Sequence, residues 1–461
     1  MNPRELRSAA QLSPIRLNAA GAQDALGHCF APVSLLIDAR GAGSRPLLTA
    51  IGSPQDIDRD TRSREVPIFD LPRTILLPAF VNAHTHLDLT HLGPRPHDPG
   101  RGFTPWVDMI RTERATDDDA VRASVRRGIE LSLAAGVVSV GDIAGALRTT
   151  PPTARASLTP WRTMLELGMS GVSFVEFFAI GTGRDRFKQW LPALLETVGG
   201  PALRARSGWS ARIGLQPHAP NTVCLAAYQW ACQQAATRSL PLCTHLAESP
   251  EERQFVARAQ GPMRELLERL GLWDESIAAE MGRGLSPVEH LAPTLAHAAP
   301  ILAHVNDASD ADIALLAQSR ATVAYCPRAS EYFGAERTFG PHRYRDMLAA
   351  GINVALGTDS IVNLSAAAAL TPADGGTGMS ILEEMRLLRK RDRADPVTLL
   401  RMGTVSGAGA LNLNEEAFAF SVGTRLAGVV GVDCASGKEH SRTNLVQVVL
   451  DCSCPSYLLL G

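Results

Sequence analysis

The chain has 461 residues, of which 45% are hydrophobic, and its 45 Lys and Arg side chains nearly balance 47 Asp and Glu side chains. A chain of this length can bury a core large enough that it needs neither disulfides nor a structural metal for stability. The net charge of −2 argues against a nucleic-acid or anionic-membrane partner, because either would favour a basic surface.

The cysteines and the first residues of the chain indicate a cellular compartment. The eight cysteines are scattered and form no CxxC pair, so a disulfide scaffold is not expected. The N-terminal residues lack the apolar stretch of a secretory signal, and no run approaches the roughly 18–20 apolar residues of a membrane span. We therefore expect a soluble, cytoplasmic protein.

Both ends of the chain have the character of short β-strands. Residues 28–70 and residues 418–450 contain β-type apolar runs, which Gly, Pro and Asp interrupt. These two flanks predict one small β-sandwich domain that is built from both termini. We expect residues 1–74 and 416–461 to form it, and residues 75–415 to form a separate, larger domain.

Eight short apolar runs alternate with stretches of helical spacing in the middle of the chain. Continuous apolar runs are typical of buried parallel strands, and their alternation with helices is typical of βαβ units. We therefore predict an α/β fold with a (β/α)8 TIM-type barrel, and an open doubly wound sheet is the alternative. The runs cover residues 74–86, 136–143, 171–181, 212–220, 240–249, 300–307, 321–330 and 352–360.

Several of these runs end in residues that can bind a metal, at the carboxyl ends of strands where barrel active sites are built. His84 and His86 are spaced i and i+2, so both imidazoles share one face of a strand. His245 ends the fifth run and Asp359 ends the eighth. Three imidazoles and a carboxylate suit Zn²⁺ or Fe²⁺ with one position left for water. The alternative role for Asp359 is a helix N-cap.

Three further residues lie at the same ends of the runs. Glu248 follows His245 closely enough to reach a substrate or water beside the metal, and its alternative role is a first-turn helix acid, which Glu251 and Glu252 fit better. His304 ends the sixth run, where the alternative is a buried core histidine. His218 follows the fourth run, and the neighbouring prolines hold its backbone in one direction.

The motifs HTHLDLTHL, GLQPHAP, CTHLAES, LAHVND and VALGTDS resemble the amidohydrolase superfamily, in its branch of metal-dependent aminohydrolases. The resemblance covers about residues 75–415 and preserves the order of the five motifs. It implies metal ligands at His84, His86, His245 and Asp359. It further implies a proton-shuttling role for Glu248, a water-orienting role for His304 and a substrate contact for His218.

Three features of the sequence refine this resemblance, and two of them depart from the family pattern. Binuclear members use a carbamylated lysine of the fourth strand, and no lysine lies near 212–220, so we expect one metal ion, zinc or alternatively iron. The usual Pro-x-Ser-Asn after the seventh strand is replaced by CPRASEYFG, which is more similar to aminodeoxyfutalosine deaminases. A turn of the C-terminal domain, within GTRLAGVVGVD, has also lost its usual Asp.

The resemblance and the residues together predict hydrolytic deamination of an amino-substituted aromatic ring, carried by an adenosine-type nucleoside such as aminodeoxyfutalosine. In this mechanism Glu248 protonates the ring, while His304 and Asp359 orient the attacking water. The alternatives are amide hydrolysis or triazine dechlorination by the same residues, and a barrel without catalysis that acts as a binding module. The expected partner is a small-molecule substrate, and a homodimer is left open.

Arg328 follows the seventh run and is predicted to contact the substrate. A guanidinium at this rim can bind a carboxylate through two parallel hydrogen bonds. Tyr332 and Phe333 lie just beyond it and could stack on an aromatic ring. The alternative is that Arg328 pairs with a nearby acid such as Glu331 and only braces its loop.

Overall fold

The computed structural model describes residues 3–41, 45–60, 62, 65–145, 147–148, 155–198, 209–295, 299–434 and 444–461. The chain divides into two compact units. We call residues 1–82, 130–139 and 366–461 the terminal unit, and residues 83–129 and 140–365 the central unit. Among the described residues, no helix has the length and apolar character needed to cross a membrane.

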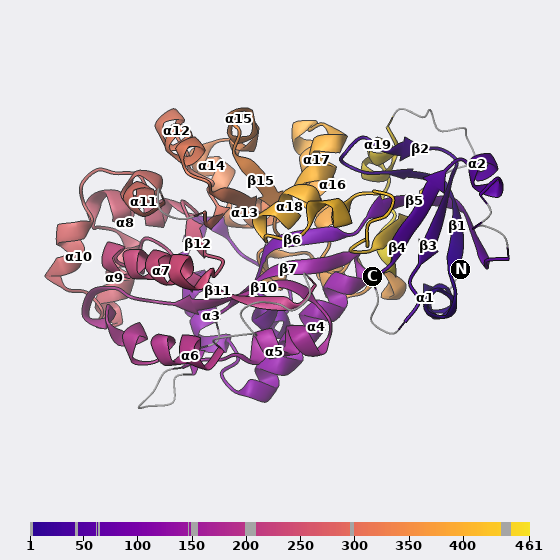
Figure 1. Ribbon diagram of the computed structural model, residues 1–461. Coiled ribbons are helices and arrows are strands. Elements are labelled where there is room, and N and C mark those ends of the chain that lie inside the picture. The colour runs from indigo at the N-terminus through magenta and orange to yellow at the C-terminus, as the bar shows by residue number, and fades with distance from the viewer. Residues whose placement is uncertain are drawn as a thin grey trace. The chain divides into compact units, whose positions relative to one another are not determined.

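Eight strands form two four-stranded sheets, and each strand coincides with one of the eight predicted apolar runs (Figure 1). Their order is β11-β10-β7-β6 in one sheet and β12-β13-β14-β15 in the other. The strands are β6 (Phe80–Thr85), β7 (Val137–Ala144), β10 (Ser170–Phe177), β11 (Ala211–Pro217), β12 (Cys243–Leu246), β13 (Ile301–His304), β14 (Thr322–Tyr325) and β15 (Asn353–Leu356). Nearly all of their residues are buried, as the continuous apolar runs predict.

The pairing of these strands is parallel wherever its register is defined. Strands β10 and β11 pair in parallel, as do β12 with β13, β13 with β14, and β14 with β15. Two single parallel bridges, Leu215 with Leu242 and Thr85 with Asp359, connect the ends of the two sheets. The prediction of a mixed α/β fold with parallel strands is therefore confirmed.

Helices connect these strands, as the alternating pattern predicts. They include α3 (Thr104–Glu113), α4 (Asp118–Ala134), α5 (Thr159–Glu166), α6 (Leu191–Val198), α7 (Leu225–Arg238), α8 (Pro250–Arg258), α9 (Pro262–Arg269), α10 (Glu275–Glu280), α11 (Pro287–Leu295), α12 (Asp310–Gln318), α13 (Pro327–Phe333), α14 (Ala335–Phe339) and α15 (Tyr344–Ala349). The start of α8 is typical, since Ser249 accepts a hydrogen bond from the Glu252 amide and Pro250 occupies the first turn.

The terminal unit contains one sheet of seven strands that come from both ends of the chain. Its order is β17-β16-β5-β1-β3-β4, and β2 pairs with β1. The strands are β1 (Ile15–Gln23), β2 (Cys29–Phe30), β3 (Val33–Asp38), β4 (Leu47–Gly52), β5 (Ile68–Pro78), β16 (Val429–Val432) and β17 (Ser456–Leu460). The described residues of this unit form no second sheet, so they do not confirm the predicted sandwich.

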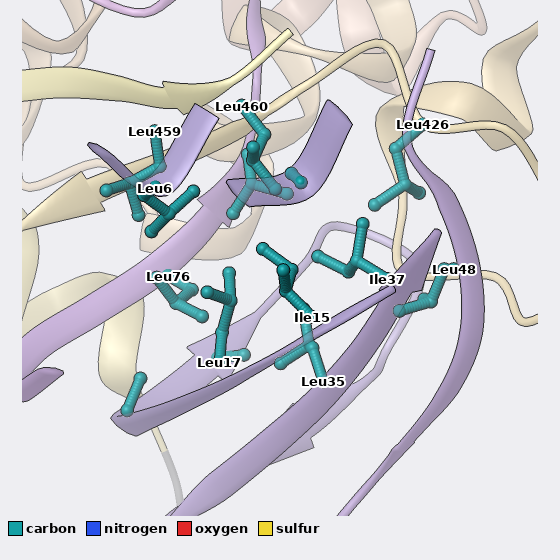
Figure 2. Packing of buried hydrophobic residues seen from close by; sticks show 14 of the residues in the cluster. Leu6, Ile15, Leu17, Leu35, Ile37, Leu48, Leu76, Leu426, Leu459 and Leu460 are labelled. Carbon is teal, nitrogen blue, oxygen red and sulfur yellow. The ribbon is translucent and has the colours of Figure 1, made fainter. Parts of the chain in front are cut away.

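Helices provide the partner layer that a second sheet would provide in a sandwich. Helix α1 (Pro3–Leu12) packs against β17, and α19 (Leu445–Asp451) packs against β1. Helices α2 (Pro54–Asp58), α16 (Ile381–Asp392), α17 (Pro396–Gly403) and α18 (Val405–Ala410) complete the unit. Figure 2 shows the core of this sheet, where Leu6 of α1 lies next to Leu459 in one cluster with residues of β1, β3 and β5.

Candidate metal centre and active site

The residues predicted to bind a metal meet in the central unit. His84 is buried near the end of β6, His86 follows that strand, and His245 is buried in β12. The two facing Nε2 atoms of His86 and His245 lie 3.4 Å apart. Asp359 Oδ1 lies 3.7 Å from His84 Nε2 and 3.5 Å from His86 Nε2. The structure thus brings all four predicted ligands together.

Backbone hydrogen bonds hold Asp359 beside β6. The His86 amide donates to the Asp359 carbonyl at 2.7 Å, and the Asp359 amide donates to the His84 carbonyl at 3.1 Å. Asp359 has a left-handed backbone with φ of 58°, a conformation that costs a non-glycine residue about 1–2 kcal/mol. Gly357 permits this approach, because a Cβ atom there would lie 2.8 Å from the His84 carbonyl oxygen.

The cluster fits a divalent cation in both geometry and chemistry. Ligand atoms placed tetrahedrally around zinc at about 2.0–2.1 Å lie about 3.4 Å from one another, close to the separations found here. Both ring nitrogens of His84, Nδ1 of His86 and Oδ2 of Asp359 are buried without a hydrogen bond. Buried polar atoms are normally satisfied, so these atoms indicate a site that is completed by a bound group.

Burial also sets the protonation of these ligands. It lowers the pKa of His84 and of His245 to about 3, so both imidazoles are neutral at physiological pH. Neutral imidazole is the form that binds a metal. Burial raises the pKa of Asp359 to about 7, since a desolvated carboxylate disfavours its charged form. A divalent cation would provide that opposite charge.

Glu248 and His304 lie next to this cluster. Glu248 Oε1 is 3.5 Å from His304 Nε2, and His304 belongs with His84 and His245 to a group of potential ligands within 4.8 Å of one another. Burial, followed by the charge of Asp359, raises the pKa of Glu248 well above its ordinary value. A carboxyl group that stays protonated near neutral pH can act as a general acid.

Glu252 and Asn306 fix the turn that carries Glu248. The Glu252 carboxylate accepts hydrogen bonds from the amides of Ala247 (2.9 Å) and Glu248 (2.8 Å). The Asn306 side-chain amide donates to the Glu248 carbonyl at 3.0 Å. Ala247 needs this support because its φ is 52°. Glu252 lies in the first turn of α8, as the sequence analysis expected, and its contacts with the Ala247 and Glu248 amides are an additional role that was not predicted.

His304 is held by a residue that the sequence analysis did not identify. His304 ends β13 with φ of 73°, and Val305 continues with φ of 51°. His342 Nε2 lies 2.9 Å from the His304 carbonyl oxygen, and the His342 ring stacks on Tyr325 with centroids 3.6 Å apart. His342 lies in the segment GPHRYRDMLAAG, but only the fold shows that it contacts His304.

His218 directly follows β11, where its carbonyl oxygen lies 3.0 Å from His245 Nδ1. This contact directs His245 Nε2 toward the cluster. His218 Nδ1 hydrogen-bonds the Thr222 hydroxyl at 2.7 Å, and its Nε2 lies 4.0 Å from Glu176 Oε1. Burial lowers the pKa of His218 to about 3. The ring is therefore neutral and fixed in direction.

A network of charged side chains, centred on Arg114, lies beside the residues that follow His86. Arg114 donates two hydrogen bonds to Asp88, from Nε at 2.9 Å and from Nη2 at 3.1 Å, and a third from Nη1 to Glu176 at 3.3 Å. Asp142 accepts a hydrogen bond from the Leu87 amide at 3.0 Å, directly after His86. Asp88 belongs to the motif HTHLDLTHL, but its pairing with Arg114 was not predicted.

A pocket opens beside Glu248. Its wall carries the aromatic rings of His97, Phe103 and Phe333, and its charged groups include Glu251 and Arg337. The Phe103 and Phe333 rings lie 5.1 Å apart, and Tyr332 stacks on His97 at 4.9 Å.

Arg328 is half-buried on α13 and does not line this pocket. Its predicted contact with substrate therefore stays a prediction, as do the catalytic roles of Glu248, His304 and Asp359 and the substrate contact of His218. Their positions agree with those roles, since Glu248, His304 and Asp359 meet at one cluster.

Sequence comparison identifies a family and several known proteins that are similar to this chain. The sequence profile of the Amidohydrolase family matches residues 75–424. The chain is 28% identical over 350 residues to the aminodeoxyfutalosine deaminase of Deinococcus radiodurans, and the matched residues make up 72% of each of the two chains. It is 27% identical over 380 residues to the 5-methylthioadenosine/S-adenosylhomocysteine deaminase of Moorella thermoacetica, covering 78% of this chain and 73% of that protein.

Two solved structures share the fold. The Helicobacter pylori aminofutalosine deaminase in complex with methylthio-coformycin superposes with a TM-score of 0.71 at 18% identity, over 97% of this chain and 98% of that chain. The zinc complex of the atrazine chlorohydrolase of Arthrobacter aurescens TC1 gives a TM-score of 0.65 at 19% identity, over 95% and 91%. At these identities, the likeness concerns the fold alone.

Proposed function

Because the chain belongs to the amidohydrolase family, we propose that it is a metal-dependent hydrolytic deaminase that acts on the amino-bearing ring of an adenosine-type nucleoside. The observation that carries this proposal is the half-buried carboxyl group of Glu248 beside His304 and the four-ligand cluster. The two deaminases reported above, from Deinococcus radiodurans and Moorella thermoacetica, support this substrate class.

The proposed architecture is a closed (β/α)8 barrel with a small domain built from both termini. The two single bridges, between Leu215 and Leu242 and between Thr85 and Asp359, support closure, since they connect both pairs of sheet ends. The proposed domain boundaries are 1–74, 75–415 and 416–461. A homodimer stays a prediction.

One metal ion, zinc or alternatively iron, is held in this proposal by His84, His86, His245 and Asp359. A metal of this kind supplies a water molecule that can act as a nucleophile near neutral pH. A single ion is favoured because no lysine lies on β11, where binuclear relatives carry their bridging group. The unsatisfied ring nitrogens of His84 support its place among the ligands.

The chain's own residues move the protons. Glu248 donates a proton to the ring nitrogen beside the amino-bearing carbon, which makes that carbon electrophilic. His304 and Asp359 orient the attacking water and accept its proton, which passes through His304 to the Glu248 carboxylate. Glu248 then transfers this proton to the departing ammonia. The position of Glu248, 3.5 Å from His304, supports this exchange between neighbouring groups. His218, with its ring fixed by Thr222, contacts the substrate ring or its substituent.

The decisive experiment measures ammonia release from a panel of substrates by metal-loaded protein. We expect aminopurine nucleosides, aminodeoxyfutalosine among them, to exceed cytosine, guanine, triazines and simple amides. Chelation should abolish turnover, and added zinc or iron should restore it. Release of chloride from a triazine, or of an amine from an amide, without nucleoside deamination would overturn the proposal.

A variant tests the role of Glu248 separately. Glu248→Gln keeps the size of the side chain but cannot supply the proton, so turnover should fall by about 10²–10⁴-fold while metal content stays unchanged. Glu265→Gln is the matched control, because Glu265 is an exposed acid in the first turn of α9. Near-normal turnover of Glu248→Gln would remove this residue from the mechanism.

A further inference from the structure

Two neighbouring phenylalanines at the end of strand β10 have different surroundings. Phe177 is buried, and its ring packs against the ring of Phe187 with centroids 5.0 Å apart. Phe178 directly follows the strand and is 38% exposed. Because side chains alternate along a strand, Phe178 continues the face that carries Glu176, whose Oε1 lies 4.0 Å from His218 Nε2. An exposed aromatic side chain therefore lies on the face of β10 that meets the candidate site.

The ring of Phe178 lies against the ring of His218. Their centroids are 4.6 Å apart, and their planes are inclined at 33°. The His218 ring in turn lies 5.0 Å from the ring of His245, one of the candidate metal ligands. The side chain of His218 is itself 27% exposed. The three rings thus form a series of neighbours that begins at the metal cluster and ends at an exposed ring.

Backbone hydrogen bonds attach Phe178 to the segment that carries His218. On one side of Phe178, the His218 amide donates to the Phe177 carbonyl at 3.1 Å. On the other side, the Ala179 amide donates to the Thr222 carbonyl at 3.0 Å. The Thr222 hydroxyl also hydrogen-bonds to His218 Nδ1 at 2.7 Å. The chain is thus held on both sides of Phe178, and the ring stays next to His218.

We propose that Phe178 is a specificity-determining residue that binds the fused second ring of a bicyclic substrate, such as an adenine nucleoside. The inference rests on the proposed function, in which the amino-bearing carbon lies at the metal and His218 contacts the reacting ring. In that position a single six-membered ring ends beside His218, whereas a fused ring extends beyond it to Phe178. An aromatic side chain suits this contact, because every base has a π-face on which such a ring can stack.

The alternative is that Phe178 only supports His218. Single exposed apolar side chains are common on protein surfaces, and a ring at 4.6 Å can hold the imidazole in place without meeting a substrate. Loss of such a support would disturb His218 and would affect every substrate that reaches the metal. Loss of a stacking contact would affect only those substrates that have a second ring. The number of rings in the substrate therefore distinguishes the two roles.

The test measures binding without turnover, on the full-length, metal-loaded protein. The probe is 2-aminopurine riboside, a fluorescent bicyclic nucleoside without an amino group at the reacting carbon, and its fluorescence anisotropy gives the Kd. Cytidine, whose base has one ring, is measured by competition with this probe. Phe178→Ala should weaken the binding of 2-aminopurine riboside about 10-fold, and that of cytidine by less than about 2-fold, since stacking on the second ring is lost.

Three further variants complete the binding test. Phe178→Tyr keeps the ring and should bind both nucleosides as the unchanged protein does. Phe178→Leu keeps an apolar side chain without a ring, so it should also weaken the bicyclic probe selectively, and it replaces Phe178→Ala if that variant does not fold. Leu270→Ala is the matched control, because Leu270 is an equally exposed apolar residue of the central unit, at 38%. It should change neither affinity.

Steady-state kinetics with an adenine nucleoside gives an independent readout. Phe178→Ala should raise KM about 10-fold and leave kcat nearly unchanged, because stacking contributes equally to the ground state and the transition state. A fall in kcat without a rise in KM would instead indicate that Phe178 supports His218, and would overturn the inference.

Three results of the binding test would also overturn the inference. They are equal weakening of the two nucleosides by Phe178→Ala, unchanged binding of both, and a failure of the unchanged protein to bind 2-aminopurine riboside. If the unchanged protein deaminates adenine nucleosides and Phe178→Ala matches it in every readout, only this inference fails. If the unchanged protein releases no ammonia, the proposed function fails, and the binding test still decides the role of Phe178.

Discussion

The two sides of the candidate site are held in place by different physical means. Beside His86, ion pairs hold the segment in place, since Arg114 hydrogen-bonds to Asp88 and to Glu176. Beside Glu248, amide hydrogen bonds to Glu252 hold a turn with left-handed backbone. Removing one partner of a buried charge network leaves a charge uncompensated, whereas removing one amide acceptor leaves a neutral group unsatisfied. Substitutions in the Arg114 network should therefore mainly lower the stability of the fold. Substitutions of Glu252 should mainly disturb the position of Glu248.

The largest effect on stability is expected from Arg114→Met. This change leaves Asp88 and Glu176 buried without a cation, so the free energy of unfolding should fall by about 3–5 kcal/mol. Urea denaturation followed by circular dichroism measures it. The metal should also bind about 10–100-fold more weakly, because Asp88 helps to orient the segment after His86.

Arg111→Met is the control for this prediction. Arg111 lies in the last turn of α3, which Arg114 directly follows, and its pair with Asp108 is partly exposed, so its loss should change stability by less than about 1 kcal/mol. Equal destabilisation by the two variants would show that the buried network contributes nothing beyond an ordinary helix arginine.

A smaller effect is expected from Glu252→Gln. One of the two amides, of Ala247 or Glu248, loses its acceptor, which costs about 1–3 kcal/mol. Since this turn positions Glu248, kcat should fall about 10-fold while KM stays nearly constant. Steady-state kinetics with the best nucleoside substrate checks both values. If Glu252→Gln loses stability but keeps the full kcat, then Glu252 only supports the fold; Glu265→Gln should change neither.

The smallest effect, limited to one class of substrate, is expected from Arg328→Met. If Arg328 binds a carboxylate, kcat/KM for a carboxylated nucleoside should fall about 10-fold, and an uncharged analogue should be unaffected. Arg337→Met is the matched comparison, because Arg337 lines the pocket beside Glu248 and Arg328 does not. Selective loss in Arg337→Met alone would move the carboxylate contact from one arginine to the other.

The sequence predicted the elements of the central unit well. Each of the eight apolar runs became a strand, because burial of both faces requires continuous apolar residues and such runs are visible without a structure. The terminal unit was harder to predict. Its β-runs were identified, but the amphipathic residues of α1 and α19 gave no signal that helices, instead of a second sheet, would cover it.

The candidate site divides in the same way. His84, His86, His245 and Asp359 were predicted because metal ligands belong to few residue types and follow the ends of strands. Glu252, Asn306, His342 and Arg114 were missed, because a supporting role depends on which distant backbone group a side chain meets.

By itself, the sequence determined the strand positions, the identities of the candidate ligands and the family, since each of these can be identified from local patterns of residue type. Only the tertiary structure decided how those residues are held. The left-handed turns at Ala247, His304 and Asp359 are unfavourable as isolated peptide conformations. They exist because hydrogen bonds from remote segments offset their cost, and no local pattern specifies those partners.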